Sequence, residues 1–295
     1  IGDSSFMNIL IGDWAGSKLV SGTKNIIMGN CAGACCAITG SGNLYLGSLA
    51  GRCTTTGSDN IALGRNSLGE AEFSGSDNIV LGQNAAKAIT SSSNLIAIVD
   101  EALSTEDANG SGVIAIGLEA LKIQNASTNV GGTIGKNIAI GEKAGLNLVD
   151  ATENIFLGYY AGSGVLGSKN IAIGSKTLNA STSGQLNVAI GLDAAKANTG
   201  SSNVVIGGNA AAGGAGDGSE NVFLGQYSGY NISDGDKNTF LGRGTGNTVT
   251  TGCCNVLIGY NVDAVAASDK TFKIGIAADT WISGDSSYNT TLAGI

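Results

Sequence analysis

Asn170-Ile171-Ala172-Ile173-Gly174 is one copy of a phrase that recurs along the whole chain: Asn, then Ile or Val, any residue, Ile or Leu, and Gly. Further copies are Asn60-Ile61-Ala62-Leu63-Gly64 and Asn255-Val256-Leu257-Ile258-Gly259. The closing positions follow one another at intervals of 16 to 18 residues, with a single interval of 24, and Val99 takes the place of the glycine between Gly82 and Gly117. A period near 17 is too short for paired-helix repeats and suits one coil of a solenoid. We therefore predict an all-β, parallel β-solenoid or β-roll of about 16 coils.

The composition agrees with this period. The chain has 295 residues, of which 48 are Gly and none is Pro. Proline cannot donate the N–H that a strand gives to the neighbouring coil, so its absence fits a continuous ladder. Glycine at this density disfavours helices. We expect the closing glycines, and a second glycine three residues before most of the asparagines, to turn corners at positive φ.

Composition also excludes several functions. The chain has no His, which removes every catalytic relay that depends on imidazole. A net charge of −8 argues against nucleic acid and anionic membranes as partners. The longest apolar runs, such as residues 95–99, are far too short to span a bilayer. We expect no cofactor, no resident metal and no membrane insertion.

The repeat sets the domain organisation. Residues 1–262 are predicted to form the solenoid shaft, as a single unit, and residues 263–295 a degenerate last coil with a C-terminal transition segment. The one long interval marks an insertion near residues 121–136. Insertions in solenoids emerge on one face and often make contacts.

Asparagine opens the phrase in most coils. We predict that these side chains form a ladder in which amides one coil apart hydrogen-bond along the solenoid axis. The alternative is a row of outward amides that binds glycans. The ladder comprises Asn8, Asn25, Asn43, Asn60, Asn78, Asn137, Asn154, Asn170, Asn187, Asn203, Asn221, Asn238 and Asn255.

The residue between the two aliphatic positions of the phrase is apolar in almost every coil, so the strand does not alternate between apolar and polar residues. We predict that the flanking Ile and Leu fill the interior and that this middle column packs against identical columns of sister chains, in a homotrimeric fibre. The predicted interface residues are Leu10, Ile27, Tyr45, Val80, Phe156, Val205, Phe223, Phe240 and Leu257.

Two other groups of residues could form sites. Cys35 and Cys53 lie six positions after their closing glycines, hence at equivalent places on adjacent coils, and a disulfide between them is possible. A metal cluster is disfavoured because no Cys-x-x-Cys pair is repeated at finger spacing.

Acidic turns place oxygens close together as Ca²⁺ requires, although solvated turns are the favoured interpretation. The weak Ca²⁺ candidates are Asp217, Glu220, Asp234 and Asp236.

Phrases such as Asn137-Ile138-Ala139-Ile140-Gly141 resemble the repeats of the β-roll heads of YadA-type trimeric adhesins. They are closer to the repeats that precede the intramolecular chaperone domain of phage and algal-virus tail fibres, and residues 280–287 resemble the segment that ends such regions. The resemblance covers roughly residues 5–290. The period exceeds the 14 or so residues of the adhesin heads, and no autocleavage motif is identifiable.

The resemblance implies a non-enzymatic structural protein, the shaft of a viral tail fibre that attaches to a host surface. Its partners would be two further copies of itself and a host receptor or glycan, and its location the virion surface or an extracellular appendage. The head or stalk of a bacterial trimeric adhesin is the alternative. A third possibility is a tailspike-like enzyme that degrades polysaccharide with paired carboxylates, although no pair stands out.

Overall fold

The structure is a computed structural model that describes residues 7–70, 72–105, 111–123, 135–149, 151–180, 183–214, 216–287 and 289–292. Within these residues the fold is all-β, without a helix, and forms a parallel β-solenoid of about 15 turns with a period near 17 residues. The insertion predicted near residues 121–136 falls largely on residues 124–134, outside the described residues. Two compact units make up the chain, Ile1–Asn154 and Ile155–Ile295.

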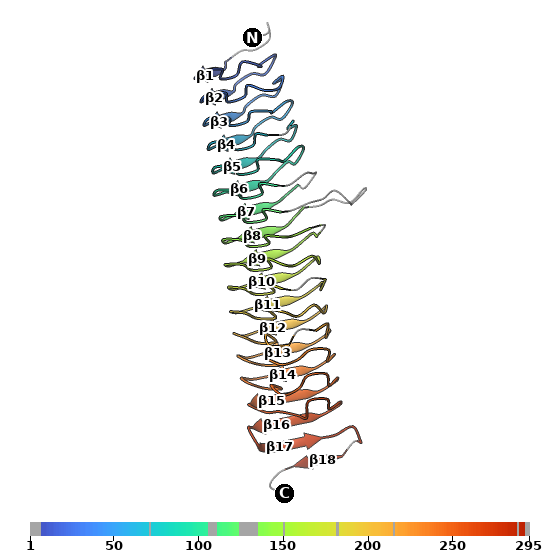
Figure 1. Cartoon of the computed structure of the whole chain (residues 1–295). Helices are drawn as coiled ribbons and strands as arrows, with labels where there is room; N and C mark the ends of the chain where they lie inside the picture. The colour runs from blue at the N-terminus through green and yellow to red at the C-terminus, as the bar shows by residue number, and fades with distance from the viewer. Residues whose placement is uncertain are drawn as a thin grey trace. The chain divides into compact units, whose positions relative to one another are not determined.

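Each turn contributes one short strand to a parallel stack (Figure 1). The strands of the first unit are β1 (Ile9–Ile11), β2 (Ile26–Met28), β3 (Leu44–Leu46), β4 (Ile61–Leu63), β5 (Ile79–Leu81), β6 (Ile96–Ile98), β7 (Ile114–Ile116) and β8 (Ile138–Ile140). Those of the second are β9 (Ile155–Leu157), β10 (Ile171–Ile173), β11 (Val188–Ile190), β12 (Val204–Ile206), β13 (Val222–Leu224), β14 (Thr239–Leu241), β15 (Val256–Tyr260), β16 (Phe272–Ile276), β17 (Asp279–Gly284) and β18 (Thr290–Leu292). Equivalent positions of the phrase pair with one another, for example Ala172 with Ala189.

The middle residue of each strand faces the interior of the coil, which corrects the predicted interface. Side chains such as Tyr45 and Phe156 have no exposed surface within a single chain, so they cannot contact another chain. A three-residue strand points its first and third side chains to one face and its second to the other. The narrow coil therefore receives one side chain per strand, and the flanking aliphatics lie outside. The correction applies to Ile27, Tyr45, Val80, Phe156, Val205, Phe223, Phe240 and Leu257, which are all buried, and to Leu10, which points the same way but is half-buried in the first described turn.

Size complementarity across the coil confirms this orientation. The residue six positions after the middle one reaches the same part of the interior. Where the middle residue is Phe156, the later residue is Gly162, whose missing side chain leaves room for the ring. Where the middle residue is Ala172, the later residue is Leu178, and both are buried. In these two turns a large residue at one position accompanies a small residue at the other, as close packing requires.

The two sets of glycines have different roles. The closing glycines turn the corner at positive φ as predicted, for example Gly174 at 132°. The second set was predicted to do the same, and that prediction is wrong, because Gly218 and Gly235 are not among the positive-φ glycines. They are needed instead for close approach, since a Cβ on Gly218 would lie 2.6 Å from the carbonyl oxygen of Gly235 in the next turn.

Antiparallel strands end the second unit. The parallel stack continues through β15 and β16, and β17 then pairs antiparallel with β16, followed by β18 against β17. These last strands lie within the predicted transition segment, residues 263–295. They cover the free edge that β16 would otherwise present, which limits uncontrolled strand pairing there.

Candidate functional site: the outward strand face

The first and third residues of the strands point away from the interior and form two columns of aliphatic side chains, here named the outward face. In the first unit they are Ile9, Ile11, Ile26, Met28, Leu44, Leu46, Ile61, Leu63, Ile79, Leu81, Ile96, Ile98, Ile114, Ile116, Ile138 and Ile140. In the second unit they are Ile155, Leu157, Ile171, Ile173, Val188, Ile190, Val204, Ile206, Val222, Leu224, Thr239, Leu241, Val256 and Ile258. Thr239 is the single polar member.

The outward face leaves much of its apolar surface in contact with solvent. Ile140, Ile206 and Leu224 are 40%, 38% and 37% exposed. Because neighbouring strands in a sheet lie about 4.8 Å apart, these side chains touch from turn to turn and make a continuous patch in each unit. An extended apolar patch of this kind is typical of an interaction surface.

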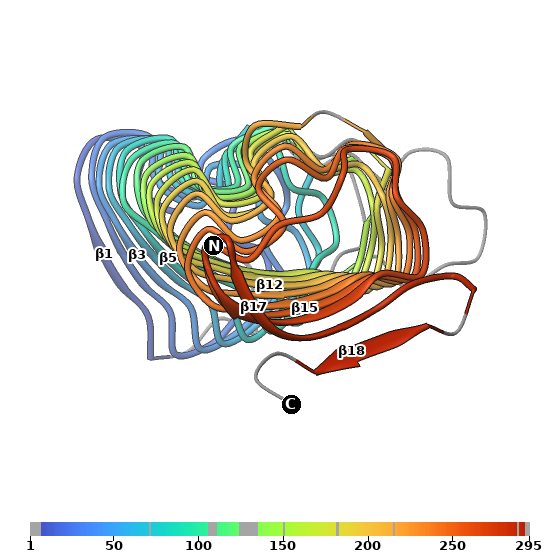
Figure 2. The same cartoon turned by 90° about the horizontal axis from the view of Figure 1, so that it is seen from below.

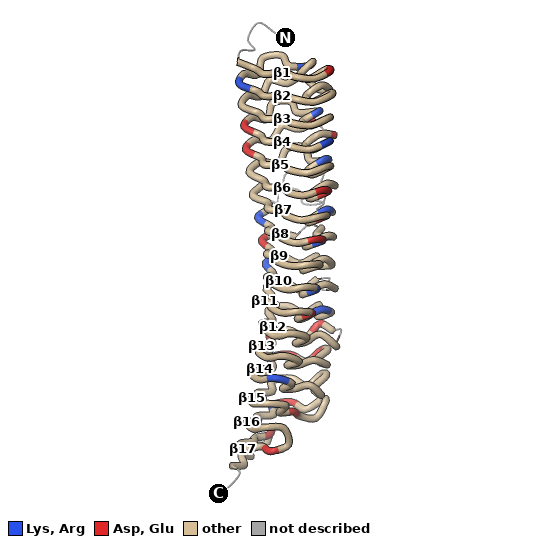
Figure 3. The backbone as a smooth tube through the Cα atoms, turned by 90° about the vertical axis from the view of Figure 1, so that its left-hand side faces the viewer, with Lys and Arg blue, Asp and Glu red and all other residues tan. Residues whose placement is uncertain are grey.

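Charged residues avoid the outward face. No residue of β1 to β15 is charged, and Figure 3 shows Lys, Arg, Asp and Glu along the margins of the turns, beside the strands. Ion pairs form there between neighbouring turns, as between Lys122 and Glu101 at 2.6 Å, and within one turn, as between Lys122 and Glu119 at 2.7 Å. Figure 2 shows the strands of the second unit, such as β12 and β15, along one side of the coil. The face is therefore uncharged as well as apolar.

The asparagine ladder is confirmed, and it lies inside the coil. The Oδ1 atom of Asn60 accepts hydrogen bonds from the backbone N–H and the Nδ2 of Asn78, at 3.1 and 2.8 Å. The Nδ2 of Asn60 donates to Asn43 Oδ1 and to the carbonyl of Gly75, both at 3.0 Å. These amides are buried, so the alternative of an outward, glycan-binding row is wrong for them. Leu95 takes the asparagine slot in its turn, and its N–H still donates to Asn78 Oδ1.

The weak Ca²⁺ candidates are not brought together. Asp236 uses a carboxylate oxygen to accept the backbone N–H of Ser219 at 2.7 Å. Among the described residues, the one group of potential metal ligands with mutually close donor atoms consists of cysteines, with no acidic residue in it. Asp217, Glu220 and Asp234 therefore remain separate turn residues.

All six cysteines are free thiols, so the predicted Cys35–Cys53 disulfide is not formed. The predicted equivalence of the two positions is nevertheless confirmed, because the N–H of Cys35 donates to the carbonyl of Arg52 at 2.9 Å, as in the strand register. The Sγ atoms of Cys35, Cys36 and Cys53 all lie within 4.8 Å of one another. The prediction missed Cys36 as a member of this group.

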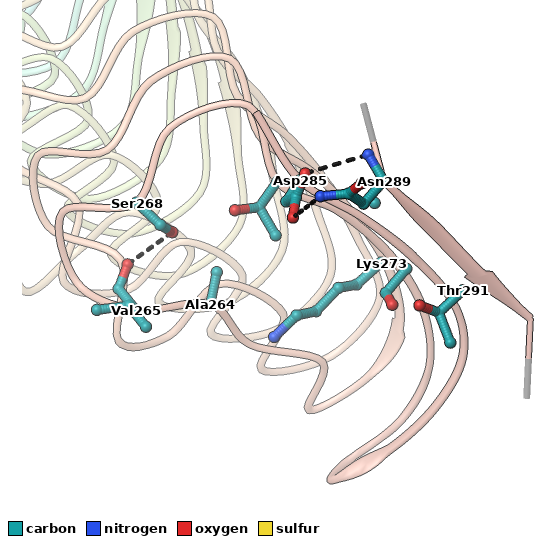
Figure 4. Close-up of a pocket in the computed structure, with 10 residues that line it drawn as sticks. Ala264, Val265, Ser268, Lys273, Asp285, Asn289 and Thr291 are labelled. Carbon is teal, nitrogen blue, oxygen red and sulfur yellow. Dashed lines mark hydrogen bonds between the residues drawn. The ribbon is translucent and has the colours of Figure 1, made fainter. Parts of the chain in front are cut away.

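A hollow of about 300 Å³ lies near the C-terminal end of the second unit (Figure 4). Lys273 extends along it and donates from Nζ to the carbonyl of Asp263 at 2.7 Å. At its other side Asp285 accepts hydrogen bonds from Asn289 Nδ2 and the backbone N–H of Ser287. These bonds, that from Asn289 first, hold the pKa of the Asp285 carboxyl below its usual value. Both charged groups are thus engaged within the chain, and Asp285 is the one carboxylate among the described residues that line the hollow.

Comparisons with known proteins add no relative: no protein-family model matches the chain, and neither the curated proteins nor the solved structures contain a match. In the described part of the chain, no helix has the length and apolar character needed to cross a membrane.

Proposed function

We propose that the protein is a non-enzymatic structural shaft whose chains associate side by side through the outward face, as a homotrimer. The observation that carries the proposal is the pair of uncharged aliphatic columns that follows the strands of each unit. A second copy of this chain is the occupant that fits best, because its own columns have the same spacing from turn to turn. Threefold association follows from the resemblance of the repeats to those of trimeric fibres.

Within this proposal the shaft belongs to a viral tail fibre or a similar appendage, at the virion surface or outside the cell, and it presents a part that attaches to a host receptor or glycan. The solenoid supports this function through its mechanical design. Neighbouring turns are tied together by strand pairing and by the buried asparagine ladder, in which Leu95 replaces one asparagine and keeps only the backbone hydrogen bond. A fibre shaft requires this repetition along one axis and no reactive centre.

The association can be tested with a pair of matched variants. Ile206→Glu with Leu224→Glu places two carboxylates on adjacent turns of the outward face, where burial of a charge against another chain is costly. We expect the double variant to sediment as a monomer while its circular dichroism stays unchanged. The control is Leu166→Glu with Leu186→Glu, two leucines that are 47% and 56% exposed outside the strands. A double variant on the outward face that stays assembled would overturn the proposed interface.

The location can be tested separately. Gold-labelled antibodies raised against the purified chain should decorate a thin appendage of virus particles from the source of this sequence. Label confined to a bacterial cell envelope would overturn the fibre assignment and support the adhesin alternative. The sedimentation result would stand in either case.

A further inference from the structure

A cluster of three cysteines lies at the margin of the first unit, away from the outward face. Cys35 and Cys53 occupy equivalent places on neighbouring turns, and Cys36 follows Cys35 directly. The three side chains differ in exposure: Cys35 is exposed, Cys36 half-buried and Cys53 buried. Their Sγ atoms nevertheless converge within 4.8 Å of one another. The fold thus brings together three sulfur atoms from two turns.

The spacing of these sulfur atoms fits one shared ion. A zinc–thiolate bond is about 2.3 Å long, which places the sulfur atoms of a tetrahedral site about 3.8 Å apart. In the structure the sulfur atoms lie no more than 4.8 Å apart. Binding a zinc ion would therefore shorten the sulfur–sulfur distances by about 1 Å at most. Rotation of the Cys35 side chain, which is exposed, can supply this change. We propose that Cys35, Cys36 and Cys53 form a three-thiolate site for a soft d¹⁰ cation of the zinc and copper(I) class.

The ligand set determines the class of ion. Three thiolates without imidazole or carboxylate select soft ions over Mg²⁺ or Ca²⁺, which prefer oxygen. Three protein ligands also leave a fourth position open for solvent or a small exogenous ligand. Cys35 lines a shallow groove of about 360 Å³ together with Trp14, Cys31 and Arg52, through which such a ligand can approach.

The charges around the cluster suit bound metal. Three thiolates and one divalent cation carry a net charge of −1, and Arg52 lies close enough to Cys35 to interact with it electrostatically. Thiolate is the form of cysteine that binds metal, so binding replaces thiol protons with the cation and releases them to solvent, and no oxidant or reductant is needed.

The chain contains its own matched control. Cys253 and Cys254 are also adjacent in sequence, yet no third thiol faces them. The Sγ of Cys253 instead accepts a hydrogen bond from the backbone N–H of Asp236 at 3.3 Å, and the backbone N–H of Cys253 donates to the Asp269 carboxylate. Two vicinal pairs would bind two ions per chain if adjacency alone were sufficient. The proposed site predicts one.

The test is a titration of the reduced full chain with Zn²⁺, and with Cd²⁺ as a spectroscopic probe. We expect one equivalent bound per chain, a sulfur-to-cadmium charge-transfer band and a rise in the unfolding temperature. Cys53→Ala and Cys36→Ser should each weaken binding by at least about tenfold, whereas Cys253→Ala with Cys254→Ala should leave it unchanged.

Other turns of the solenoid show which substitutions at the cysteine positions are compatible with folding. Ala88 and Ala180 lie six positions after their closing glycines, the place of Cys35 and Cys53 in their own turns, so Cys35→Ala is expected to fold and to lose the ion. Absence of binding to the folded, reduced wild type would overturn the site. Equal binding by Cys35→Ala, or complete conversion of the protein isolated without reductant to a Cys35–Cys53 disulfide, would also overturn it.

Discussion

The ring of Tyr45 occupies the space that a side chain on Gly51 would need: a Cβ on Gly51 would lie 2.5 Å from the ring Cδ2 atom. The same relationship links Phe223 with Gly229, where the nearest ring atoms would be 3.1 Å away. The size of the residue at the position of Gly51 and Gly229 therefore fits the size of the middle strand residue six positions earlier. Interior volume, more than local propensity, determines which residue stands there.

This coupling predicts the result of a double-mutant cycle. Phe156→Ala should cost about 3–5 kcal/mol because it leaves a cavity, and Gly162→Leu should cost about 1–3 kcal/mol or more because it overpacks the interior. The combined variant recreates the Ala172 and Leu178 arrangement of the next turn. Its midpoint in urea unfolding should lie closer to the wild type than that of Phe156→Ala. Additive losses would contradict the coupling.

The buried hydroxyl of Tyr45 is a polar group without a hydrogen-bond partner among the described residues. Burial raises the pKa of this phenol. Phenylalanine stands at the equivalent position in Phe156, Phe223 and Phe240. Tyr45→Phe should therefore raise the free energy of unfolding by about 1 kcal/mol, the cost of an unsatisfied buried group. A destabilised Phe variant in thermal unfolding would show that the hydroxyl is satisfied.

The asparagine ladder should be sensitive to single breaks. Asn60→Ala removes bonds to the turns on both sides and leaves buried donors and acceptors without partners. We expect a loss of about 2–4 kcal/mol in the free energy of unfolding. Asn30 is an exposed control that makes a 3.5 Å contact with Asp13, and Asn30→Ala should change stability by less than about 0.5 kcal/mol. Similar effects of both substitutions would refute the structural role of the ladder.

The margin of the first unit contains an acid-sensitive ion cluster. Hydrogen bonding from Lys122, which lies 2.7 Å away, lowers the pKa of the Glu119 carboxyl from its ordinary 4.5. A lowered carboxyl pKa gives stability that is present above the unfolded-state pKa and lost as pH falls through the folded-state pKa. Lys122→Met should therefore lower the unfolding temperature at pH 7 by a small amount and have less effect at pH 3. An equal effect at both pH values would contradict the pairing.

Much of the fold could be predicted from the sequence because the constraints repeat. The phrase from Asn170 to Gly174 indicates the period, the strand and the buried asparagine, and each turn confirms the others. The direction of the strand faces was predicted the wrong way round. The correct direction could have been found by comparing the middle strand residue with the residue six positions later. One turn has the large Phe156 with the small Gly162, and the next has the small Ala172 with the large Leu178. Neither position shows this relationship when it is considered alone.

The backbone conformation at some turn positions and the direction of the Cys36 side chain could not be predicted from the aligned repeats. Lys176 and Leu178 adopt positive φ near 56° and 48°, although neither residue type favours that conformation. The stacked turns impose it, because the chain must bend where the neighbouring coils bend. The thiol cluster needed three-dimensional information for a similar reason: the equivalence of Cys35 and Cys53 follows from the period, but the direction of the Cys36 side chain depends on the local turn.

The mass of the assembly in solution tests the central claim most directly. Sedimentation equilibrium of the purified chain, whose mass is 29.2 kDa, gives the number of chains without any assumption about shape. The account predicts three chains per particle at micromolar concentration, held together by the outward face. A particle of one chain, with the aliphatic columns stable in water on their own, would contradict it.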